Sequence, residues 1–192
     1  MDSDKRHRLL MGPFGSGKSV GCVMDLTQRA AAQPPDENGV RKTRWAVVRN
    51  TYKQLEDTTI ATWMDWFPHP MWGRFVSSDN NYFMQWALDD NTVVQCEIRF
   101  RALDRPDQVV NLLSAEYTGA WFNEARSISK EIWEGMDGRI GRYPATKDGG
   151  CLWKGILLDT NPPDEDSWIY NFFEETRHDN AQAFYQDRKR VG

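Results

Sequence analysis

The sequence contains few of the residue types from which disulfide frameworks and metal centres are built. Its 192 residues include only three cysteines and three histidines. Cys22, Cys96 and Cys151 are isolated and unevenly spaced, which fits neither a disulfide framework nor a zinc site and indicates buried cytosolic thiols. The three histidines show no ligand spacing, so we assign them no chemistry.

Membrane segments and a general excess of positive charge are also lacking. No apolar run approaches the roughly 18 residues that suggest a membrane span, and the first residues, MDSDKRHRLLMG, include no hydrophobic signal segment. The net charge of −4 excludes a globally basic nucleic-acid coat, so contacts with phosphate backbones would come from local basic patches. The length and the 40% of hydrophobic residues are those of one globular domain.

The chain instead shows short apolar runs that alternate with amphipathic segments, which indicates an α/β protein. Strands are expected over 8–11, 44–49, 119–122 and 155–159, and a β-hairpin over 82–88 and 92–100. Helices are expected over 18–32, 129–136 and 166–175, around the stripe of Ile60, Trp63, Met64 and Phe67, and over 105–113 with Asp104 as its cap. Residues 33–43 are expected to form a polar loop. The strands are apolar on both faces, which is typical of a parallel sheet covered by helices.

The strongest motif is GPFGSGKS, which matches G-x-x-x-x-G-K-[S/T] between an expected strand and an expected helix. Its glycines allow backbone N–H groups to surround an anion, and the helix N-terminus adds positive partial charge. Lys18 would reach the β- and γ-phosphates of ATP, and Ser19 would offer its hydroxyl to Mg2+. The predicted nucleotide-binding residues are Gly12, Pro13, Phe14, Gly15, Ser16, Gly17, Lys18 and Ser19. The alternative is a glycine-rich turn with an exposed lysine.

A second stretch, YTGAWFNEA, is an apolar run that ends in Asn123 and Glu124. We call residues 12–19 the phosphate loop. A nucleotidase needs a second parallel strand that ends beside this loop and supplies both a magnesium partner and a group that orients the attacking water. We assign the water to Glu124 and the magnesium position to Asn123, acting through a coordinated water. Asn123 lacks a full negative charge and weakens the metal site, for which Asp159 in GILLD would compensate. Alternatively, NEA caps the segment that follows.

Three motifs in order, GPFGSGKS, GAWFNEA and LLDTNPP, resemble the ATPase domain of the large terminase subunit of tailed bacteriophages. VVRNTYKQL and GRIGRYP strengthen the resemblance, which covers nearly the whole chain. It implies a P-loop NTPase fold of the additional-strand, catalytic-glutamate class. The expected architecture is therefore a mostly parallel central sheet with helices on both faces and a β-hairpin insertion.

The resemblance also implies a function. Such proteins are motors that use ATP hydrolysis to drive double-stranded DNA into an empty procapsid. In this chain the role of coupling hydrolysis to DNA movement would fall to Thr160 and Asn161, whose side chains can hydrogen-bond phosphate or water. A turn opened by Asn161-Pro162 is an equally good interpretation of that segment.

Partners and location follow from the same resemblance. These motors assemble as a ring, generally a pentamer, on the portal protein of the procapsid, and the small terminase subunit is a further partner. This chain is accordingly expected in the host cytoplasm, docked transiently on the procapsid, and as a monomer in isolation. The nuclease domain of full large terminases is not seen, so residues 1–192 are expected to form a single ATPase domain.

The sequence departs from the family in the phosphate loop, where many terminases carry an arginine that this chain lacks. An arginine that completes the transition state must then come from elsewhere in the chain or from a ring neighbour. Arg101 and Arg105 are the leading candidates, because they precede the strand that ends in Asn123 and Glu124, as the family's arginine finger does. The next candidates are Arg139, Arg142 and Arg49. Each of these arginines also fits a surface or structural role.

Two basic clusters are candidates for contact with DNA, RKTR at 41–44 and RKR at 188–190, although such clusters are more often solvated loops. Two other function classes remain open. A nucleotide-binding regulatory switch with vestigial hydrolysis would not need a carboxylate at Glu124. A P-loop kinase of small molecules fits less well, because no acceptor-binding lid is recognisable.

Overall fold

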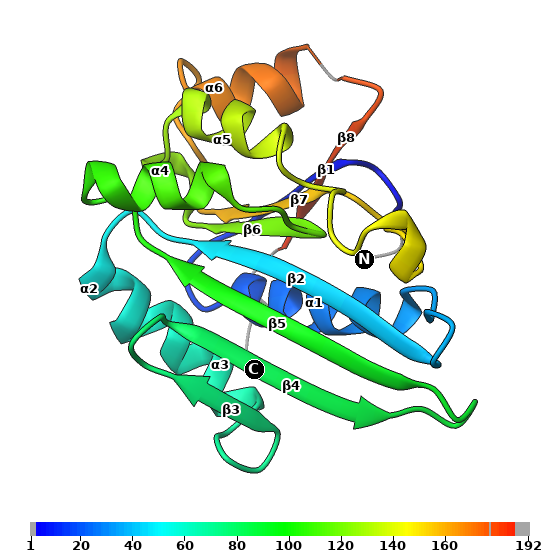
Figure 1. The fold of residues 1–192 in the computed structure, drawn as a ribbon. Coiled ribbons are helices and arrows are strands. Elements are labelled where there is room, and N and C mark those ends of the chain that lie inside the picture. Colours follow the sequence, from blue (N-terminus) through cyan, green and yellow to red (C-terminus); the bar gives the residue numbers. More distant parts are fainter. Residues whose placement is uncertain (1–2, 177, 187–192) are drawn as a thin grey trace, which may run out of the picture.

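The computed structural model describes residues 3–176 and 178–186, which form an eight-stranded sheet with helices on both of its faces (Figure 1). Its strands are β1 (His7–Met11), β2 (Val40–Val48), β3 (Gly73–Val76), β4 (Asn81–Ala87), β5 (Val93–Arg101), β6 (Gly119–Asn123), β7 (Ile156–Thr160) and β8 (Ala181–Tyr185). Their order across the sheet is β3-β4-β5-β2-β6-β7-β1-β8. All neighbours from β5 to β8 in this order pair in parallel, whereas β3 and β4 extend the sheet in antiparallel pairing.

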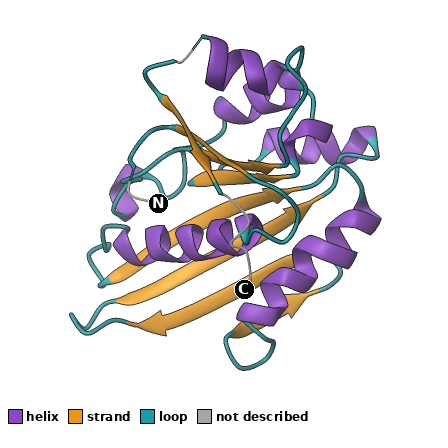
Figure 2. Ribbon diagram, turned by 180° about the vertical axis from the view of Figure 1, so that it is seen from behind, coloured by secondary structure: helices purple, strands orange, loops and turns teal. Residues whose placement is uncertain are grey.

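The helices form two layers. The helices on the face seen in Figure 2 are α1 (Lys18–Ala32), α2 (Tyr52–Gln54) and α3 (Ala61–Trp66), with a π-helical segment, Leu55–Ile60, between α2 and α3. Those on the face seen in Figure 1 are α4 (Pro106–Ser114), α5 (Lys130–Asp137) and α6 (Trp168–Tyr170), which a second π-helical segment, Asn171–Glu175, extends. Short 3-10 turns occupy Ala125–Ser127 and Thr146–Asp148. In the part of the chain that the structure describes, no helix has both the length and the apolar character to cross a bilayer.

Alternation along the central strands divides the apolar side chains between two cores. Val47 of β2 and Trp121 of β6 belong to the core beneath α1 and α3. Val48 and Phe122, the next residues along the same strands, belong to the core beneath α4, α5 and α6. Because both faces are covered, these strands are apolar at successive positions, which confirms the predicted sheet type.

The carboxyl ends of β1, β6 and β7 lie side by side at one edge of the sheet. β7 lies between β1 and β6, and Asp159 of β7 is the register partner of both Leu10 and Asn123. β7 is thus the additional strand between the strand of the phosphate loop and that of Glu124, as expected. In open parallel sheets ligands bind at this carboxyl edge, where the strand order reverses.

Most expected elements are confirmed near their predicted positions, and three points need correction. The polar loop expected over 33–43 ends early, because β2 begins at Val40 and pairs from there with β5. Asp104 does not cap α4; Arg105 holds the N-cap position, and the Asp104 carboxylate accepts the N–H of Tyr52 at 3.2 Å. β3 and β8 were not expected, because they are short and only partly buried, so their alternation is weak.

Candidate active site

The turn between β1 and α1 depends on its glycines. Gly15 has a φ of +72° and Gly17 a φ of +84°, in the left-handed region that other residues rarely adopt. Gly12 is required by close packing instead, because a Cβ atom there would lie 2.7 Å from the carbonyl oxygen of Gln186. α1 begins directly after the turn, and the free N–H groups of its first turn favour a bound anion.

Lys18 is a buried cation that lies across this turn, with only 6% of its surface exposed. Its Nζ donates to the carbonyl oxygens of Gly12 at 2.8 Å and Pro13 at 3.0 Å, and to Oδ1 of Asn161 at 3.1 Å. All three acceptors are neutral, and within the described residues no ion pair involves Lys18. A buried ammonium without a carboxylate partner favours the binding of an anion beside it.

A hydrogen-bonded cluster joins α1 to the ends of β6 and β7. Ser19 Oγ donates to Oδ2 of Asp159 at 3.0 Å. The amide nitrogen of Asn123 donates to both carboxylate oxygens of Asp159, each at 3.0 Å, and lies 3.2 Å from Ser19 Oγ. Trp121 Nε1 donates to Oδ1 of Asp159 at 2.7 Å. Alternation explains this convergence, because Trp121 and Asn123 share the face of β6 that is turned toward α1.

Burial dominates the electrostatics of the cluster. Asp159 has no exposed surface. Burial raises the pKa of its carboxyl group, and the hydrogen bonds from Asn123, Trp121 and Ser19 partly offset that rise. Burial also lowers the pKa of the Arg49 guanidinium, although the negative charges of Glu124 and Asp159 act to raise it.

The oxygen of Asn123 is turned away from Ser19. Oδ1 accepts from Nη1 of Arg49 at 2.5 Å and from Oγ1 of Thr59 at 2.7 Å. Arginine can only donate, and a charged carboxylate such as that of Asp159 can only accept, so the two sides of Asn123 fix the orientation of its amide. The expected role of Asn123, accepting from a metal-bound water through its oxygen, therefore does not match this geometry.

Glu124 is the first residue after β6 and adopts left-handed backbone angles, with φ 53° and ψ 56°. It lines a cavity of about 200 Å³, together with residues from the phosphate loop, α1, the end of β2, the π-helical segment and α3. The other lining residues are Phe14, Ser19, Arg49, Thr58, Thr59, Thr62 and Asn123. The phosphate loop and the tip of β6 thus share one cavity. The alternative capping role is not observed, because the 3-10 turn after Glu124 has no side-chain cap hydrogen bond.

The donor set suits Mg2+ in character. Within the described residues no cluster of three or more histidine, cysteine, aspartate or glutamate side chains is present. Mg2+ usually takes one or two carboxylates, keeps several waters and relies on the phosphates of its nucleotide. The Ser19 hydroxyl and the buried carboxylate of Asp159, side by side at the phosphate loop, match that requirement.

Thr160 and Asn161 also lie against the phosphate loop. The carbonyl oxygen of Thr160 accepts the N–H of Gly12 at 3.3 Å, and Asn161 accepts from Lys18 as described. Thr160 is fully buried, and its hydroxyl has no hydrogen-bond partner among the described residues. Both residues are thus in contact with the loop whose ligand state they are predicted to relay.

The structure does not bring Arg101 and Arg105 to this cavity. Arg101 pairs in register with Val48, whose side chain faces α4, so it points to the face opposite Asn123. Both arginines line a separate hollow of about 490 Å³, where Arg101 bonds the carbonyl of Asp79. Arg139 and Arg142 lie near Tyr117, before the amino end of β6. Only Arg49 among the candidate arginines lines the cavity of its own chain.

The basic cluster at 41–44 is engaged within the chain. Arg41 pairs with Asp90 at 2.6 Å, Lys42 with Asp36 at 2.8 Å and Arg44 with Glu97 at 2.6 Å. These contacts favour the structural interpretation of RKTR. The second cluster, RKR at 188–190, lies outside the described residues.

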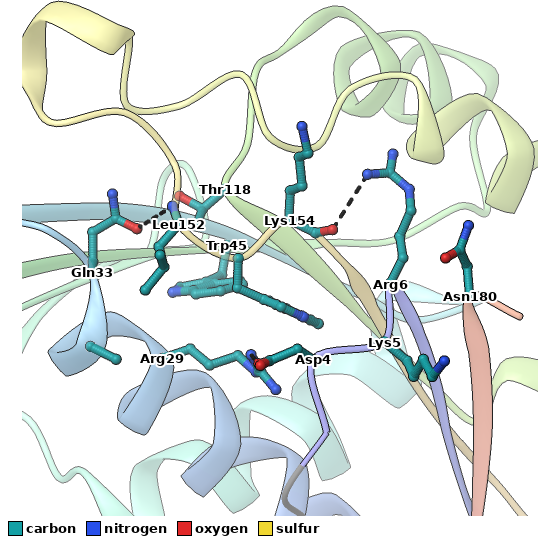
Figure 3. Close-up of a pocket in the computed structure, with 12 residues that line it drawn as sticks. Asp4, Lys5, Arg6, Arg29, Gln33, Trp45, Thr118, Leu152, Lys154 and Asn180 are labelled. Atoms are coloured by element: carbon teal, nitrogen blue, oxygen red, sulfur yellow. Dashed lines mark hydrogen bonds and ion pairs between the residues drawn. The ribbon is translucent and has the colours of Figure 1, made fainter.

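A larger hollow of about 530 Å³ lies at the opposite edge of the sheet (Figure 3). It is lined by residues that precede the parallel strands, including Arg6 before β1 and Lys154 before β7. Its two arginines are already engaged: Arg6 contacts Asp137 and the carbonyl of Lys154, and Arg29 pairs with Asp25 at 3.0 Å. Because it is at the amino edge and far from the phosphate loop, we do not assign the nucleotide to it.

Thr58, Thr59 and Thr62 line the cavity but were not predicted as site residues. A π-helical segment, which often marks functional positions, places the hydroxyl of Thr59 against Asn123. The only signal is a pair of threonines within an amphipathic helix, and it does not distinguish α- from π-helical hydrogen bonding.

Comparison with solved structures identifies similar folds. The large terminase of a thermophilic bacteriophage aligns in crystal form 2 with a TM-score of 0.74 and 11% sequence identity, over 95% of this chain and 41% of that one. Complexes of the same protein with ADP and with ATP-γ-S align with TM-scores of 0.69 and 0.68, at 12% and 10% identity. Each complex aligns over 95% of this chain and 40% of the terminase.

No family model and no curated protein matches the sequence. The structural similarity extends over nearly the whole of this chain, which spans about two fifths of the length of the terminase. The expected resemblance is thus confirmed at the level of the fold. This chain shares its α/β P-loop architecture with the large terminase of that thermophilic bacteriophage.

Proposed function

We propose that this chain is an Mg2+-dependent ATPase, and that it is the motor domain with which a large terminase drives double-stranded DNA into a viral procapsid. The observation that carries the proposal is the cavity that Glu124 shares with Ser19 of the phosphate-loop helix. A binding loop and a carboxylate at one cavity are what hydrolysis of a phosphoanhydride requires. The complexes of the bacteriophage terminase with ADP and ATP-γ-S support a nucleotide as the ligand.

The phosphate loop would bind the nucleotide through its backbone. The N–H groups of the turn and of the α1 N-terminus would donate to phosphate oxygens, and Lys18 would exchange its carbonyl acceptors for the β- and γ-phosphates. Ser19 and the carboxylate beside it would hold Mg2+, which neutralises charge on the phosphates when bound. The side chain of Phe14 is 68% exposed, so the loop is accessible from solvent.

Glu124 would position the attacking water. Its side chain is partly exposed and lines the cavity next to Arg49. A carboxylate in that place accepts a hydrogen bond from the water and aligns it for attack on the γ-phosphate. Arg49 is the chain's own candidate for stabilising negative charge there, and an arginine from a ring neighbour would add to it.

The motor assignment adds partners to this chemistry. In the proposal a ring of these chains, a pentamer, docks on the portal protein in the host cytoplasm and receives DNA with the help of the small terminase subunit. The similarity to a large terminase over nearly the whole chain supports this part. Thr160 and Asn161, in contact with the phosphate loop, would relay the nucleotide state to the parts that grip DNA.

The test combines ATP binding with phosphate release for the wild-type chain and two isosteric variants. Glu124→Gln should bind ATP with unchanged affinity and lose phosphate release by about 100-fold or more. Glu134→Gln, which alters an exposed glutamate on α5, is the matched control and should behave as wild type. Turnover by Glu124→Gln at the wild-type rate would refute the catalytic role of Glu124, and a wild-type chain that releases no phosphate would refute the ATPase assignment.

A second measurement separates the motor from a regulatory switch. Phosphate release is followed at high protein concentration, which allows rings to form, with and without double-stranded DNA. A motor should hydrolyse ATP faster when DNA is present, whereas a switch with vestigial hydrolysis should bind ATP and release almost no phosphate under either condition.

A further inference from the structure

The carboxylate nearest to the phosphate-loop hydroxyl belongs to β7 and not to β6. Asp159 Oδ2 lies 3.0 Å from Ser19 Oγ, and the side chain is completely buried. Burying a carboxylate is costly unless hydrogen bonds or a cation compensate it. Three donors surround this one, from Ser19, Asn123 and Trp121, and all three are electrically neutral. Among the described residues, this buried carboxylate therefore has no cationic partner in hydrogen-bond contact.

Asn123 occupies the β6 position to which the magnesium ion was assigned, and the orientation of its amide does not suit that role. It presents its amide nitrogen to Ser19, and an amide nitrogen can neither ligate a cation nor accept from a water. Its oxygen is committed to Arg49 and Thr59. Instead, the amide nitrogen of Asn123 donates to both carboxylate oxygens of Asp159, and these contacts fix the plane of that carboxylate.

Negative charges at both position 123 and position 159 would also be unfavourable. Asn123 and Asp159 are direct register partners on adjacent parallel strands, with donor and acceptor atoms 3.0 Å apart. Carboxylates at both positions would repel strongly at this distance in a buried site. An asparagine on β6 is therefore the complement of an aspartate on β7, and only one of these two register partners carries a negative charge.

From this arrangement we infer that Asp159 is the magnesium-site carboxylate of this chain and that Asn123 is its positioning residue. The site would take a small divalent cation that also binds the phosphates of a nucleotide. The inference rests on the proposed nucleotide-binding function, because the phosphates supply the remaining ligands. It transfers to Asp159 of β7 the magnesium position that was predicted for Asn123 of β6.

The first experiment measures Mn2+ binding to the ADP-bound chain by electron paramagnetic resonance, with ADP affinity in the absence of divalent cations as a second readout. Asp159→Asn should weaken Mn2+ binding by about 10- to 100-fold, the range typical of changes around a metal. ADP affinity without Mn2+ should not fall, because the loop N–H groups and Lys18 remain. Asp148→Asn, an exposed aspartate, is the control and should leave both readouts unchanged.

The second experiment needs no nucleotide and measures thermal unfolding with and without millimolar Mn2+. Asn123→Asp places two carboxylates side by side, so Mn2+ should raise its melting temperature more than that of the wild type. The double variant Asn123→Asp with Asp159→Asn should lose this extra increase. Wild-type Mn2+ affinity in Asp159→Asn, or an extra increase that persists in the double variant, would overturn the inference.

The two experiments separate this inference from the proposed function. A wild-type chain that fails to bind ADP would contradict the nucleotide-binding proposal, and the melting experiment would still decide the role of Asp159. ADP binding with Mn2+ affinity that is unchanged in Asp159→Asn would leave the nucleotide site intact and reject the assigned carboxylate.

Discussion

Arg49 and Asn123 meet at the carboxyl ends of two neighbouring parallel strands, with Nη1 of the arginine 2.5 Å from Oδ1 of the asparagine. The contact connects the arginine in the cavity to the asparagine that positions Asp159. A change at the end of β2 should therefore affect both the charge in the cavity and the cluster beside the phosphate loop.

Arg49→Ala is expected to lower the turnover number by about 100-fold, the scale seen when one donor to a developing charge is removed. The KM for ATP should change much less, because the loop N–H groups and Lys18 are unaltered. Steady-state phosphate release gives both constants. Arg74→Ala, which removes an exposed arginine of β3, is the control for loss of a positive charge. Equal effects of the two substitutions would contradict a specific role for Arg49.

Thr160→Val tests the buried hydroxyl beside the phosphate loop. Because this hydroxyl has no partner among the described residues, its replacement by an isosteric methyl group should leave the free energy of unfolding unchanged or raise it by about 1 kcal/mol. If the hydroxyl relays the nucleotide state, stimulation of hydrolysis by DNA should disappear. Thr43→Val, at a buried threonine of β2 remote from the loop, should retain that stimulation. Full DNA stimulation in Thr160→Val would remove Thr160 from the coupling pair.

Glu124→Gly separates the backbone strain at this position from the role of its side chain in hydrolysis. A non-glycine residue in the left-handed region costs roughly 1–2 kcal/mol, and glycine adds roughly 0.5–1 kcal/mol of unfolded-state entropy. The two terms nearly cancel, so the free energy of unfolding in urea should stay within about 1 kcal/mol of wild type while phosphate release is lost. Glu124→Val should be clearly less stable, because a β-branched residue tolerates these angles poorly. Equal stability of the Val and Gly variants would argue against strain at this position.

The stability of the fold should depend on pH through His7 at the start of β1. Burial against Trp133 and Phe172 lowers its pKa from 6.5 to about 4, although Asp137, 3.5 Å away, acts in the opposite direction. The unfolded chain binds this proton more readily than the native chain between those two pKa values. The contribution of the neutral ring is therefore complete above the unfolded pKa and is lost as the pH falls toward about 4.

The expected loss is about 2 kcal/mol at about pH 5, from the difference in proton binding between the two states. Urea unfolding of the wild type and of His7→Gln at several pH values isolates this term, because other groups titrate in both proteins. The difference in unfolding free energy between the two should shrink as the pH falls. A constant difference over this range would contradict the depressed pKa of His7.

Local patterns in the sequence predicted much of this site. GPFGSGKS located the phosphate loop because the required residue types are contiguous, and the apolar run before Asn123 located the strand that ends beside it. The proximity of Glu124 to the loop followed from the rule that parallel strands align their carboxyl ends. These inferences depend on short-range spacing, which a single sequence retains.

Features that depend on pairing between distant segments were not predictable in the same way. The orientation of the Asn123 amide is decided by Arg49 and Thr59, which come from two other elements. Arg101 does not reach the cavity of its own chain, because strand alternation turns its side chain to the opposite face of the sheet. Predicting this would have required the register of β5 against β2. The π-helical segment before α3 depends on its packing and leaves almost no trace in its residue types.

The central claim is that the Lys18 turn and the tip of β6 serve one triphosphate, and a crystal structure of Glu124→Gln with ATP and Mg2+ tests it most directly. We expect the γ-phosphate beside Lys18, and the side chain of residue 124 within about 3 Å of a water aligned with that phosphate. A triphosphate bound elsewhere, or bound at the loop with residue 124 turned out of reach of any such water, would contradict it.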